Sequence, residues 1–408
     1  MEKQIIPVLI GADLNCYNVA RAFHEEYGVV SYAFGRYAIG ATMNTRIVKF
    51  TAVPELEKED VFLKTLSDFR EAHSDAYLIL MGCTDEYVNM IINLKEKIGS
   101  DYIMPCCSPD IANSVTQKDV FYNYCEKYDI DYPKTVVITP DGGTDALDSL
   151  PFEYPVIVKP VSSAEYWHHP FDGMKKVYCA HDSAEAKEII SLIYSSGYSM
   201  NIVVQDMIPG DDSHMYVLTS YSDKNGKVKM MCLGHVLLEE HTPKGLGNHC
   251  AVITETKRDL MEKFKAFLED IGYVGFSNFD IKYDERDGSF RAFEINTRQG
   301  RSNYYVTASG NNIAHLVVSD YIDDNLSDDC VFNEKEIYWR YIPDKIVKKY
   351  VGDGLYKKAM ELKKQKAAYS SLRYKYDLRG NLKRIAFLII HEHNHVKKFK
   401  KYYKVEKQ

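Results

Sequence analysis

The segment 277–298 carries acidic, amide and basic side chains at a spacing that suits the binding of a metal ion and a polyphosphate. Its sequence, SNFDIKYDERDGSFRAFEINTR, predicts a β-hairpin that turns at Glu285–Gly288. The turn brings Asp280 opposite Glu294, to within one residue, and Asn296 shares a face with Glu294 because alternate strand residues point the same way. Carboxylate and amide oxygens suit Mg²⁺ and do not suit zinc or copper. We therefore predict that Asp280, Glu294 and Asn296 are metal ligands rather than polar residues of an exposed hairpin.

Basic and hydroxyl side chains that could bind phosphates follow this hairpin and also an earlier strand. Arg298 and Arg301 come directly after the hairpin, where guanidinium groups could offset charge that develops in phosphoryl transfer. Lys159 ends an apolar strand, and because a buried unpaired ammonium is costly, it either reaches water or meets an anion. Ser162 and Ser163 follow and could close over phosphates, although this segment is poor in glycine.

The segment 202–212 could bind the base and the sugar of a nucleotide. It reads as a buried strand that runs into a Pro-Gly turn with two acids. An adenine could form paired hydrogen bonds with the edge of this strand, and an acid could accept hydrogen bonds from ribose hydroxyls. The alternative is a structural strand followed by an acidic turn.

The order of the predicted elements indicates two kinds of sheet. Residues 1–105 alternate strands with helices, which implies a parallel sheet with right-handed crossovers. A helical linker occupies 106–150, and from Pro151 short strands and hairpins indicate antiparallel sheets with helices packed on them. The turn Gly11–Asn15 leads into a helix and could hold an anion on its backbone N–H groups, but it lacks the GxGxxG pattern of dinucleotide-binding proteins.

Composition excludes several classes of protein. The chain has 408 residues, of which 45% are hydrophobic and 27% charged, which excludes a mostly disordered or fibrous protein. No apolar stretch approaches the roughly 20 residues of a membrane span, and the first apolar run is too short for a signal peptide, so we expect a cytoplasmic protein. The cysteines include no CxxC pair, which favours a reduced chain over a disulfide scaffold.

The C-terminal residues 335–408 are strongly basic, with 21 Lys and Arg against 7 Asp and Glu, although the whole chain has a net charge of −7. Such a tail fits either an anionic partner, such as a phosphorylated substrate, a membrane surface or nucleic acid, or a solvated helical face. The tail also contains alternating histidines, of which only His391 and His395 share a face of the expected helix. We therefore do not expect a metal site there.

In their order along the chain, these residues resemble the ATP-grasp superfamily of carboxylate–amine ligases, over about residues 1–320. More narrowly, the chain resembles the D-aspartate ligases of peptidoglycan cross-bridge synthesis. The superfamily pattern consists of Lys118, Val-Lys159-Pro, Val-Gln205-Asp-Met-Ile-Pro-Gly-x-Asp212, Asp280 and Glu294-x-Asn296-x-Arg298. The closer resemblance rests on the runs GADLN at 11–15, IPGDDS at 208–213, MMCLGH at 230–235, FDIKYD at 279–284 and EINTRQGRS at 294–302.

The resemblance implies a role for each of these residues. Lys118 and Lys159 would contact the α- and β-phosphates of ATP, and Gln205 would face the adenine, where the superfamily often has Glu. The nucleotide-binding residues that the resemblance implies are Lys118, Lys159, Ser162, Ser163, Gln205, Asp206, the backbone near Ile208, and Asp212. The metal ligands Asp280, Glu294 and Asn296 would hold one or two Mg²⁺, for which Mn²⁺ could substitute.

The resemblance also implies a mechanism. A carboxylate attacks the γ-phosphate of ATP, and an amine then displaces phosphate from the resulting acyl-phosphate. Arg298 would stabilise the transferred phosphoryl group, and Lys282 and Arg301 would touch phosphate or the acid substrate. Residues 242–248 could form the hinge of a lid that excludes water.

These observations predict an α/β plus α+β protein of ATP-grasp architecture. We expect a Rossmann-like domain at 1–110, an ATP-grasp domain at 111–325 and a basic helical C-terminal region at 326–408. The expected partners are a small amino acid, here D-aspartate, and a nucleotide- or lipid-linked peptidoglycan precursor, with possible contact between the basic tail and a membrane and no nucleic acid. The alternatives are an ATP-grasp ligase for another acid and amine, or a nucleotide-binding protein without catalysis.

Overall fold

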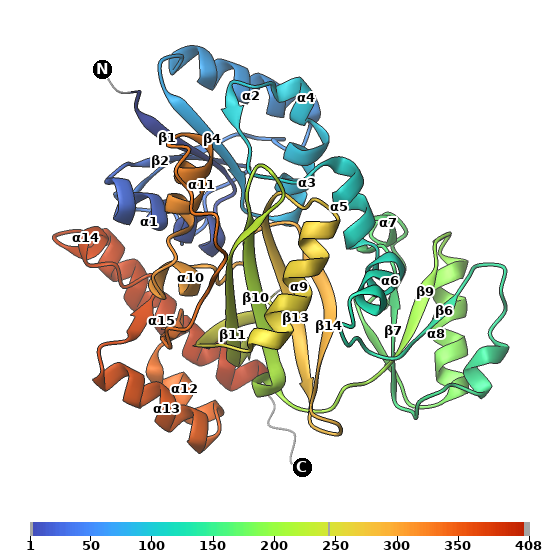
Figure 1. The fold of residues 1–408 in the computed structure, drawn as a ribbon. Coiled ribbons are helices and arrows are strands. Elements are labelled where there is room, and N and C mark those ends of the chain that lie inside the picture. Colours follow the sequence, from blue (N-terminus) through green and yellow to red (C-terminus); the bar gives the residue numbers. More distant parts are fainter. Residues whose placement is uncertain (1–2, 244, 404–408) are drawn as a thin grey trace. The chain divides into compact units, whose positions relative to one another are not determined.

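The computed structural model describes residues 3–243 and 245–403, and the chain divides into two compact units. Unit 1 is drawn from residues 1–112, 212–279 and 296–408, and unit 2 from residues 113–211 and 280–295. Figure 1 shows the elements of both units in chain order from blue to red. The three domains expected from the sequence, with their boundaries, stay a prediction.

The strands and helices have the following bounds. The strands are β1 (Ile5–Ile10), β2 (Ser31–Gly35), β3 (Val48–Ala52), β4 (Tyr77–Gly82), β5 (Tyr102–Ile103), β6 (Thr135–Ile138), β7 (Val156–Pro160), β8 (Tyr178–Ala180), β9 (Ile202–Asp206), β10 (Met215–Ser222), β11 (Val228–Glu240), β12 (Asn248–Glu255), β13 (Gly275–Asp284), β14 (Ser289–Asn296), β15 (Val331–Phe332), β16 (Tyr338–Arg340) and β17 (Ala368–Ser370). The helices are α1 (Leu14–Tyr27), α2 (Glu59–Ala72), α3 (Asp85–Asn93), α4 (Lys95–Ile98), α5 (Pro109–Thr116), α6 (Lys118–Lys127), α7 (Ser163–Tyr166), α8 (Ser183–Ser195), α9 (Arg258–Asp270), α10 (Tyr304–Ala308), α11 (Ile313–Tyr321), α12 (Asp344–Tyr350), α13 (Asp353–Lys364), α14 (Lys375–Leu378) and α15 (Leu382–Tyr402), with short 3-10 turns at Asp145–Asp148 and Asp212–His214.

Unit 1 begins with a sheet in the strand order β3-β2-β1-β4-β5, in which every pair is parallel. The apolar strands β1 and β4 are almost fully buried, as expected for a parallel sheet that helices cover on both faces. Gly11 follows β1 with φ +141°, and a Cβ there would lie 2.9 Å from the Cβ of Cys83, so only glycine fits. The carboxylate of Asp13 accepts a hydrogen bond from the backbone N–H of Cys16, so a side chain of the protein caps this helix start, where the sequence would also allow an anion.

The second sheet has the strand order β14-β13-β10-β11-β12-β16-β17, and β15 pairs with β11. The hairpins β10–β11 and β11–β12 are antiparallel, with register pairs such as Leu218 with Leu233 and Val236 with Val252. Figure 1 shows α9 lying across β10 and β11, with which it is in contact. The indole of Trp339 on β16 is fully buried in the core of unit 1. The last strands of the chain therefore contribute to the main core of this unit.

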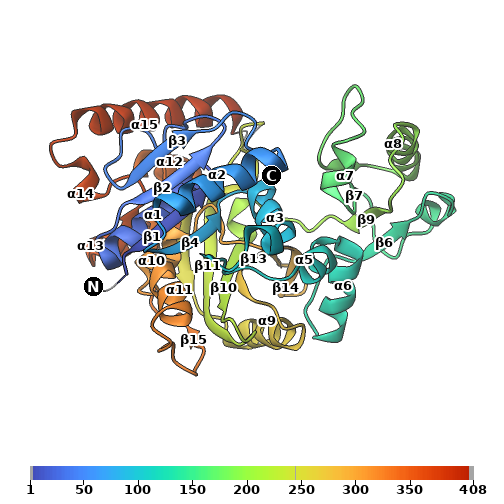
Figure 2. The same cartoon turned by 90° about the horizontal axis from the view of Figure 1, so that it is seen from above.

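Unit 2 contains a smaller antiparallel sheet in the order β6-β9-β7-β8. Burial alternates along β7, so Val156 and Val158 face the core of unit 2 and Lys159 points to the opposite side. Lys159 is paired with Val203 on β9. Figure 2 shows β6, β7 and β9 together with α7 and α8.

Most of the elements that the sequence predicts are confirmed, including the parallel sheet at the N-terminus and the hairpin that turns at 285–288. Residues 85–98, whose sequence predicts one helix, form α3 and α4, which meet at Leu94. The strand that the sequence predicts at 228–233 continues as β11 to Glu240. The strands β3, β15, β16 and β17 were not expected. Their sequences are short or rich in polar and basic residues, and β15 and β16 pair with the distant strands β11 and β12, so local patterns do not reveal them.

The basic C-terminal region contains α12 to α15 as expected, but it also contributes β16 and β17 to the second sheet. Figure 2 shows α15 along one edge of unit 1. Within the described part of the chain, no helix is both long and apolar enough to cross a membrane.

Candidate active site

Unit 2 brings together Lys118, Lys159 and Glu294, which the sequence places far apart. Lys118 begins α6, Lys159 lies near the end of β7, and Glu294 lies on β14. Nζ of Lys118 lies 3.3 Å from Oε2 of Glu294. The charge of Lys118 lowers the pKa of Glu294 to about 2, so this carboxylate is ionised at neutral pH.

The positive charges in this cluster exceed the negative ones. Burial, followed by the like charge of Lys118, lowers the pKa of Lys159 to about 7. The Lys159 ammonium lies 5.7 Å from the centre of the Phe293 ring. Lys176, which lies outside every motif and was missed, adds a further positive charge that acts on both Lys159 and Glu294. A polyphosphate carries the negative charge that would hold these lysines protonated.

The predicted metal ligands lie on β13 and β14. Asp280 is on β13, while Glu294 and Asn296 are on β14 with the i, i+2 spacing of one face. Nδ2 of Asn296 donates to the backbone oxygen of Asn278 at 3.3 Å, which orients this amide. Among residues 3–243 and 245–403 there is no cluster of three or more His, Cys, Asp and Glu side chains suited to a metal. Two carboxylates and one amide oxygen suit Mg²⁺, and the assignment of these residues as metal ligands stays a prediction.

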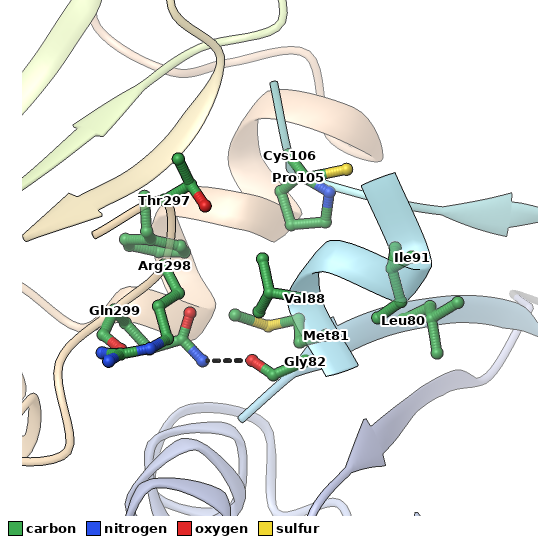
Figure 3. A pocket seen from close by; sticks show the side chains of 11 residues that line it. Leu80, Met81, Gly82, Val88, Ile91, Pro105, Cys106, Thr297, Arg298 and Gln299 are labelled. Carbon is green, nitrogen blue, oxygen red and sulfur yellow. Dashed lines mark hydrogen bonds between the residues drawn. The ribbon is translucent and has the colours of Figure 1, made fainter. Parts of the chain in front are cut away.

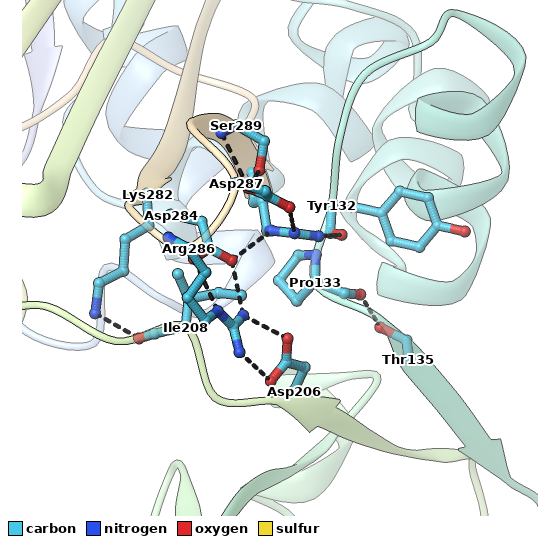
Figure 4. A network of polar contacts seen from close by, with 11 residues as sticks. Tyr132, Pro133, Thr135, Asp206, Ile208, Lys282, Asp284, Arg286, Asp287 and Ser289 are labelled. Atoms are coloured by element: carbon cyan, nitrogen blue, oxygen red, sulfur yellow. Dashed lines mark hydrogen bonds and ion pairs between the residues drawn. The ribbon is translucent and has the colours of Figure 1, made fainter. Parts of the chain in front are cut away.

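The strand β9 and the turn after it are held by the hairpin β13–β14 (Figure 4). Nε2 of Gln205 donates to the hydroxyl of Thr135 at 2.7 Å, and Gln205 is almost fully buried. Nζ of Lys282 donates to the backbone oxygens of Ile208 and Gly210, both at 2.9 Å. Lys282 thus holds the segment that we predicted to read adenine, a contact that the sequence did not indicate.

A buried ion-pair network around Asp284 also fixes this segment, and sequence reasoning missed it. Asp284 is fully buried and accepts hydrogen bonds from Arg286 and from Arg291. Arg286 binds Asp206 with both terminal nitrogens, at 3.2 and 2.6 Å (Figure 4). The Arg286 guanidinium lowers the pKa of Asp284 to about 2, so the carboxylate keeps its charge. Only the sequence DERDG at the turn could have indicated this network, because the burial of Asp284 depends on tertiary packing.

Replacing Asp284 by asparagine is expected to lower the free energy of unfolding by about 3 kcal/mol, because a buried arginine loses its carboxylate. Thermal and urea unfolding, followed by circular dichroism, measure this change. Asp287→Asn is the matched control: Asp287 lies in the same turn and also pairs with Arg291, but it is half exposed. We expect it to cost less than about 1 kcal/mol. Equal losses for both variants would contradict a special role for the buried pair.

In unit 1, Arg298 binds the carboxylate of Asp85 with two nitrogens, at 2.6 and 3.0 Å. Figure 3 shows Arg298 beside a cavity of about 20 Å³, where Nε2 of Gln299 donates to the backbone oxygen of Gly82 at 3.0 Å. Asn15 donates to the backbone oxygens of Cys83 and Gln299. The cavity has room for about one water molecule, so it is a small void between packed side chains beside Arg298 and Gln299 rather than a substrate pocket.

Asp212 and Arg301, also in unit 1, are held by partners that the sequence did not indicate. The carboxylate of Asp212 binds His241 Nε2 at 2.9 and 3.0 Å and the backbone N–H of Glu239 at 2.9 Å. The guanidinium of Arg301 lies over the ring of Tyr341, 4.8 Å from its centre. Both side chains are therefore oriented by unit 1 itself.

The expected phosphate loop and lid are only partly described. The hydroxyl of Ser162 accepts a hydrogen bond from the backbone N–H of Glu165 at 3.3 Å, which caps the short helix α7. The side chain of Ser163 lies outside the described residues. The expected lid hinge at 242–248 includes residue 244, which is also outside them, and the rest of it connects β11 to β12.

Comparison with known sequences gives one relative that spans the chain. No family model matches. The chain is 36% identical over 413 residues to a D-aspartate ligase of Enterococcus faecium (strain Aus0004), which covers 99% of this chain and 98% of that protein. It is also 26% identical over 216 residues to a D-alanine–D-alanine ligase of Petrotoga mobilis, over 51% of this chain and 65% of that protein.

Solved structures of several ligases and carboxylases share the fold at low sequence identity. A biotin carboxylase domain of Hydrogenobacter thermophilus 2-oxoglutarate carboxylase, in complex with MgADP, ADP and bicarbonate, has a TM-score of 0.57 at 12% identity, over 81% of this chain and 71% of that one. An ADP complex of N5-carboxyaminoimidazole ribonucleotide synthetase has a TM-score of 0.56 at 13% identity, over 85% of each chain. An L-amino acid ligase from Bacillus licheniformis has a TM-score of 0.53 at 14% identity, over 78% and 75%.

Proposed function

We propose a reaction for this chain from one premise: it belongs to the D-aspartate ligase family. Its fold is the expected ATP-grasp architecture, and it is an ATP-dependent ligase that forms carbon–nitrogen bonds. The substrates are the part that we infer. The acid is D-aspartate, activated at its β-carboxylate, and the acceptor is the ε-amine of lysine in a muramyl-pentapeptide precursor.

The observation that carries the proposal is the cluster of Lys118, Lys159 and Glu294. Two lysines and an ionised carboxylate, held within one unit by an ion pair of 3.3 Å, suit the phosphates and the metal of MgATP. In this proposal Lys118 and Lys159 bind the α- and β-phosphates. Glu294, with Asp280 and Asn296, holds one or two Mg²⁺, which would offset the charge of the triphosphate; Mn²⁺ could take the same place.

The base and the sugar of ATP bind along β9. Gln205 and the backbone near Ile208 read the adenine, and Lys282 and Arg286 keep this segment in place through their bonds to Ile208 and Asp206. Asp212 accepts hydrogen bonds from the ribose hydroxyls. A buried amide and a fixed backbone are rigid partners, which favours recognition of one base.

The reaction proceeds in two steps. A β-carboxylate oxygen of D-aspartate attacks the γ-phosphorus, the bond to the bridging oxygen breaks, and ADP leaves. The lysine ε-amine then attacks the acyl carbon, phosphate leaves, and the amine proton passes to solvent. Arg298 and Arg301 stabilise the negative charge on the transferred group and on the acid substrate.

The acceptor is large and anionic, and it is either nucleotide-linked or lipid-linked. The basic C-terminal region has the opposite charge, and α15 exposes Leu382, Ile389 and Ile390 on its outer side. We propose that this surface approaches the acceptor or an anionic membrane. Because the reaction consumes ATP, we propose that it takes place in the cytoplasm.

An ADP-release assay tests the proposal. We expect release that requires D-aspartate and is raised by a lysine-containing muramyl-pentapeptide, supplied in nucleotide-linked or lipid-linked form, with much lower release from L-aspartate. Release with another amino acid and no response to D-aspartate would indicate a ligase for a different acid. Nucleotide binding without release in any of these mixtures would indicate a non-catalytic protein.

A further inference from the structure

A series of buried polar side chains connects α15 to Arg301. Nη2 of Arg301 lies 3.2 Å from the hydroxyl of Tyr341, and this hydroxyl lies 2.7 Å from Nε2 of His395. Nδ1 of His395 lies 2.9 Å from the backbone oxygen of His391, one turn earlier in α15. Tyr341 is 6% exposed and His395 is 3% exposed, so water competes little for these hydrogen bonds.

The positions of the protons in this series follow from the group at its end, the backbone oxygen of His391. A carbonyl oxygen only accepts, so Nδ1 of His395 carries a hydrogen. Burial lowers the pKa of His395, which favours the neutral ring, and Nε2 of that ring accepts the proton of the Tyr341 hydroxyl. The oxygen of Tyr341 is then the acceptor for Arg301, whose guanidinium can only donate. The series therefore fixes the direction in which Arg301 points.

One nitrogen of Arg301 has no hydrogen-bond acceptor among the described residues. Nη1 of Arg301 is buried, and no described residue forms a hydrogen bond with it. Oε2 of Glu240 forms a long ion pair with Nη1 at 4.0 Å, too far for a hydrogen bond, while Oε1 of Glu240 binds Thr242 at 2.7 Å and Lys398 at 3.3 Å. A buried guanidinium nitrogen without an acceptor is costly, so an anionic ligand is the group that would complete it.

We propose that Tyr341 and His395 are positioning residues that hold Arg301 for the carboxylate of the amino-acid substrate. The proposal rests on the function proposed above, and it gives α15 a part in substrate binding. Arg301 touches the substrate, whereas Tyr341 and His395 act through Arg301. A substrate carboxylate and a phosphate of ATP can both accept hydrogen bonds from the Arg301 guanidinium. We propose that the carboxylate is the anion that binds there.

This role differs from a solvated helical face and from a metal site at the alternating histidines. A solvated helical face would leave His395 exposed, and a metal site would need one free ring nitrogen on each of His391 and His395. Instead, His395 uses both nitrogens in hydrogen bonds, and burial lowers the pKa of His391 to about 3. The inner face of α15 thus orients Arg301.

Steady-state kinetics of the full chain test the proposal with Tyr341→Phe, His395→Ala and the double variant. His395→Gln is the rescue variant, because a glutamine oxygen can accept the tyrosine proton in place of Nε2. His393→Ala is the matched control, since His393 lies on the same helix but is exposed. The KM for D-aspartate, the KM for ATP, kcat and the melting temperature are measured for each.

We expect Tyr341→Phe and His395→Ala each to raise the KM for the amino acid about tenfold, with kcat and the KM for ATP within about twofold of the wild type. The double variant should be little worse than either single one, because both act through Arg301. His395→Gln should recover part of the loss. Additive effects, an equal rise in the KM for ATP, or no change in the KM for the amino acid would overturn the proposal.

A measurement that does not depend on turnover tests this inference separately from the proposed reaction. If the wild type fails to use D-aspartate, the proposed substrate is wrong, and the same ratios are measured with the amino acid that it does use. Independently, ¹⁵N NMR of labelled histidines should find His395 in the neutral form with hydrogen on Nδ1, and Tyr341→Phe should shift its Nε2 signal. A His395 that is charged, or that does not respond, would contradict the hydrogen-bond series itself.

Discussion

Replacing Glu294 by glutamine lowers turnover by roughly 100- to 1000-fold, the usual scale for the loss of one key electrostatic group in an active site. The substitution keeps the shape of the side chain but removes the charge that pairs with Lys118. It also removes the strongest expected metal ligand, because a neutral amide binds Mg²⁺ more weakly than a carboxylate. ADP release at saturating ATP and magnesium measures the effect.

The control for this variant is Glu285→Gln, at the exposed turn of the same hairpin. It changes the same functional group and should leave turnover within about twofold of the wild type. Since removing one partner of a half-buried pair can also weaken folding, the melting temperature of both variants is needed. Near-normal ADP release from Glu294→Gln would refute the assignment of this residue.

Replacing Lys159 by alanine is expected to lower turnover by a similar factor, roughly 100- to 1000-fold. The strand β7 directs this lysine away from the core of unit 2, into the positive cluster with Lys118. Its ammonium is therefore held where a phosphate oxygen would relieve the repulsion. Lys134→Ala, an exposed lysine of the same unit, serves as the control and should have little effect.

The pKa of Lys159 gives this residue a second, independent signature. With a pKa of about 7, its ammonium is mostly protonated at pH 6 and mostly neutral at pH 8. Phosphates bind the protonated form, so the KM for ATP should rise as pH increases through 7, by up to about tenfold. In Lys159→Arg the guanidinium stays charged, and this rise should disappear. A KM for ATP with the same pH dependence in both proteins would show that Lys159 does not titrate in contact with the nucleotide.

The features that the sequence predicts well are those set by neighbouring residues. The hairpin that carries Asp280 and Glu294 follows from strand alternation and the DERDG turn, and both lie on its strands. Lys159 could be selected as a candidate because a charged residue follows the apolar run at 155–158. In each case the deciding residues lie close together in the sequence.

The features that the sequence does not reveal depend on residues that meet only in the folded chain. Tyr341 and His395 are 54 residues apart and touch only because α15 packs on unit 1. The full burial of Asp284 reflects its neighbours on other elements, as the link from Arg286 to Asp206 across 80 residues illustrates. Local periodicity contains no information on such pairs, so a search by motif finds the candidate site residues and misses those that hold them.

The C-terminal region is the clearest example. Its charge and helical periodicity suggest a detachable tail, and truncation near Glu334 would then be the natural test of its role. The structure instead pairs β16 with β12, through Val252 and Trp339, and buries the Trp339 indole. Removing this region would take a strand out of the main sheet, so point substitutions on α15 are the informative experiments.

The late position of β16 and α15 also affects how the chain folds as it leaves the ribosome. Unit 2 is complete once residue 295 has emerged, whereas unit 1 still lacks Trp339 and Phe399 from its core. Until then β12 has an unpaired edge, which is a surface that other chains can join. Newly made protein should therefore depend on chaperones until synthesis is almost finished, and a premature stop codon even near the end should give an aggregating product rather than a shorter enzyme.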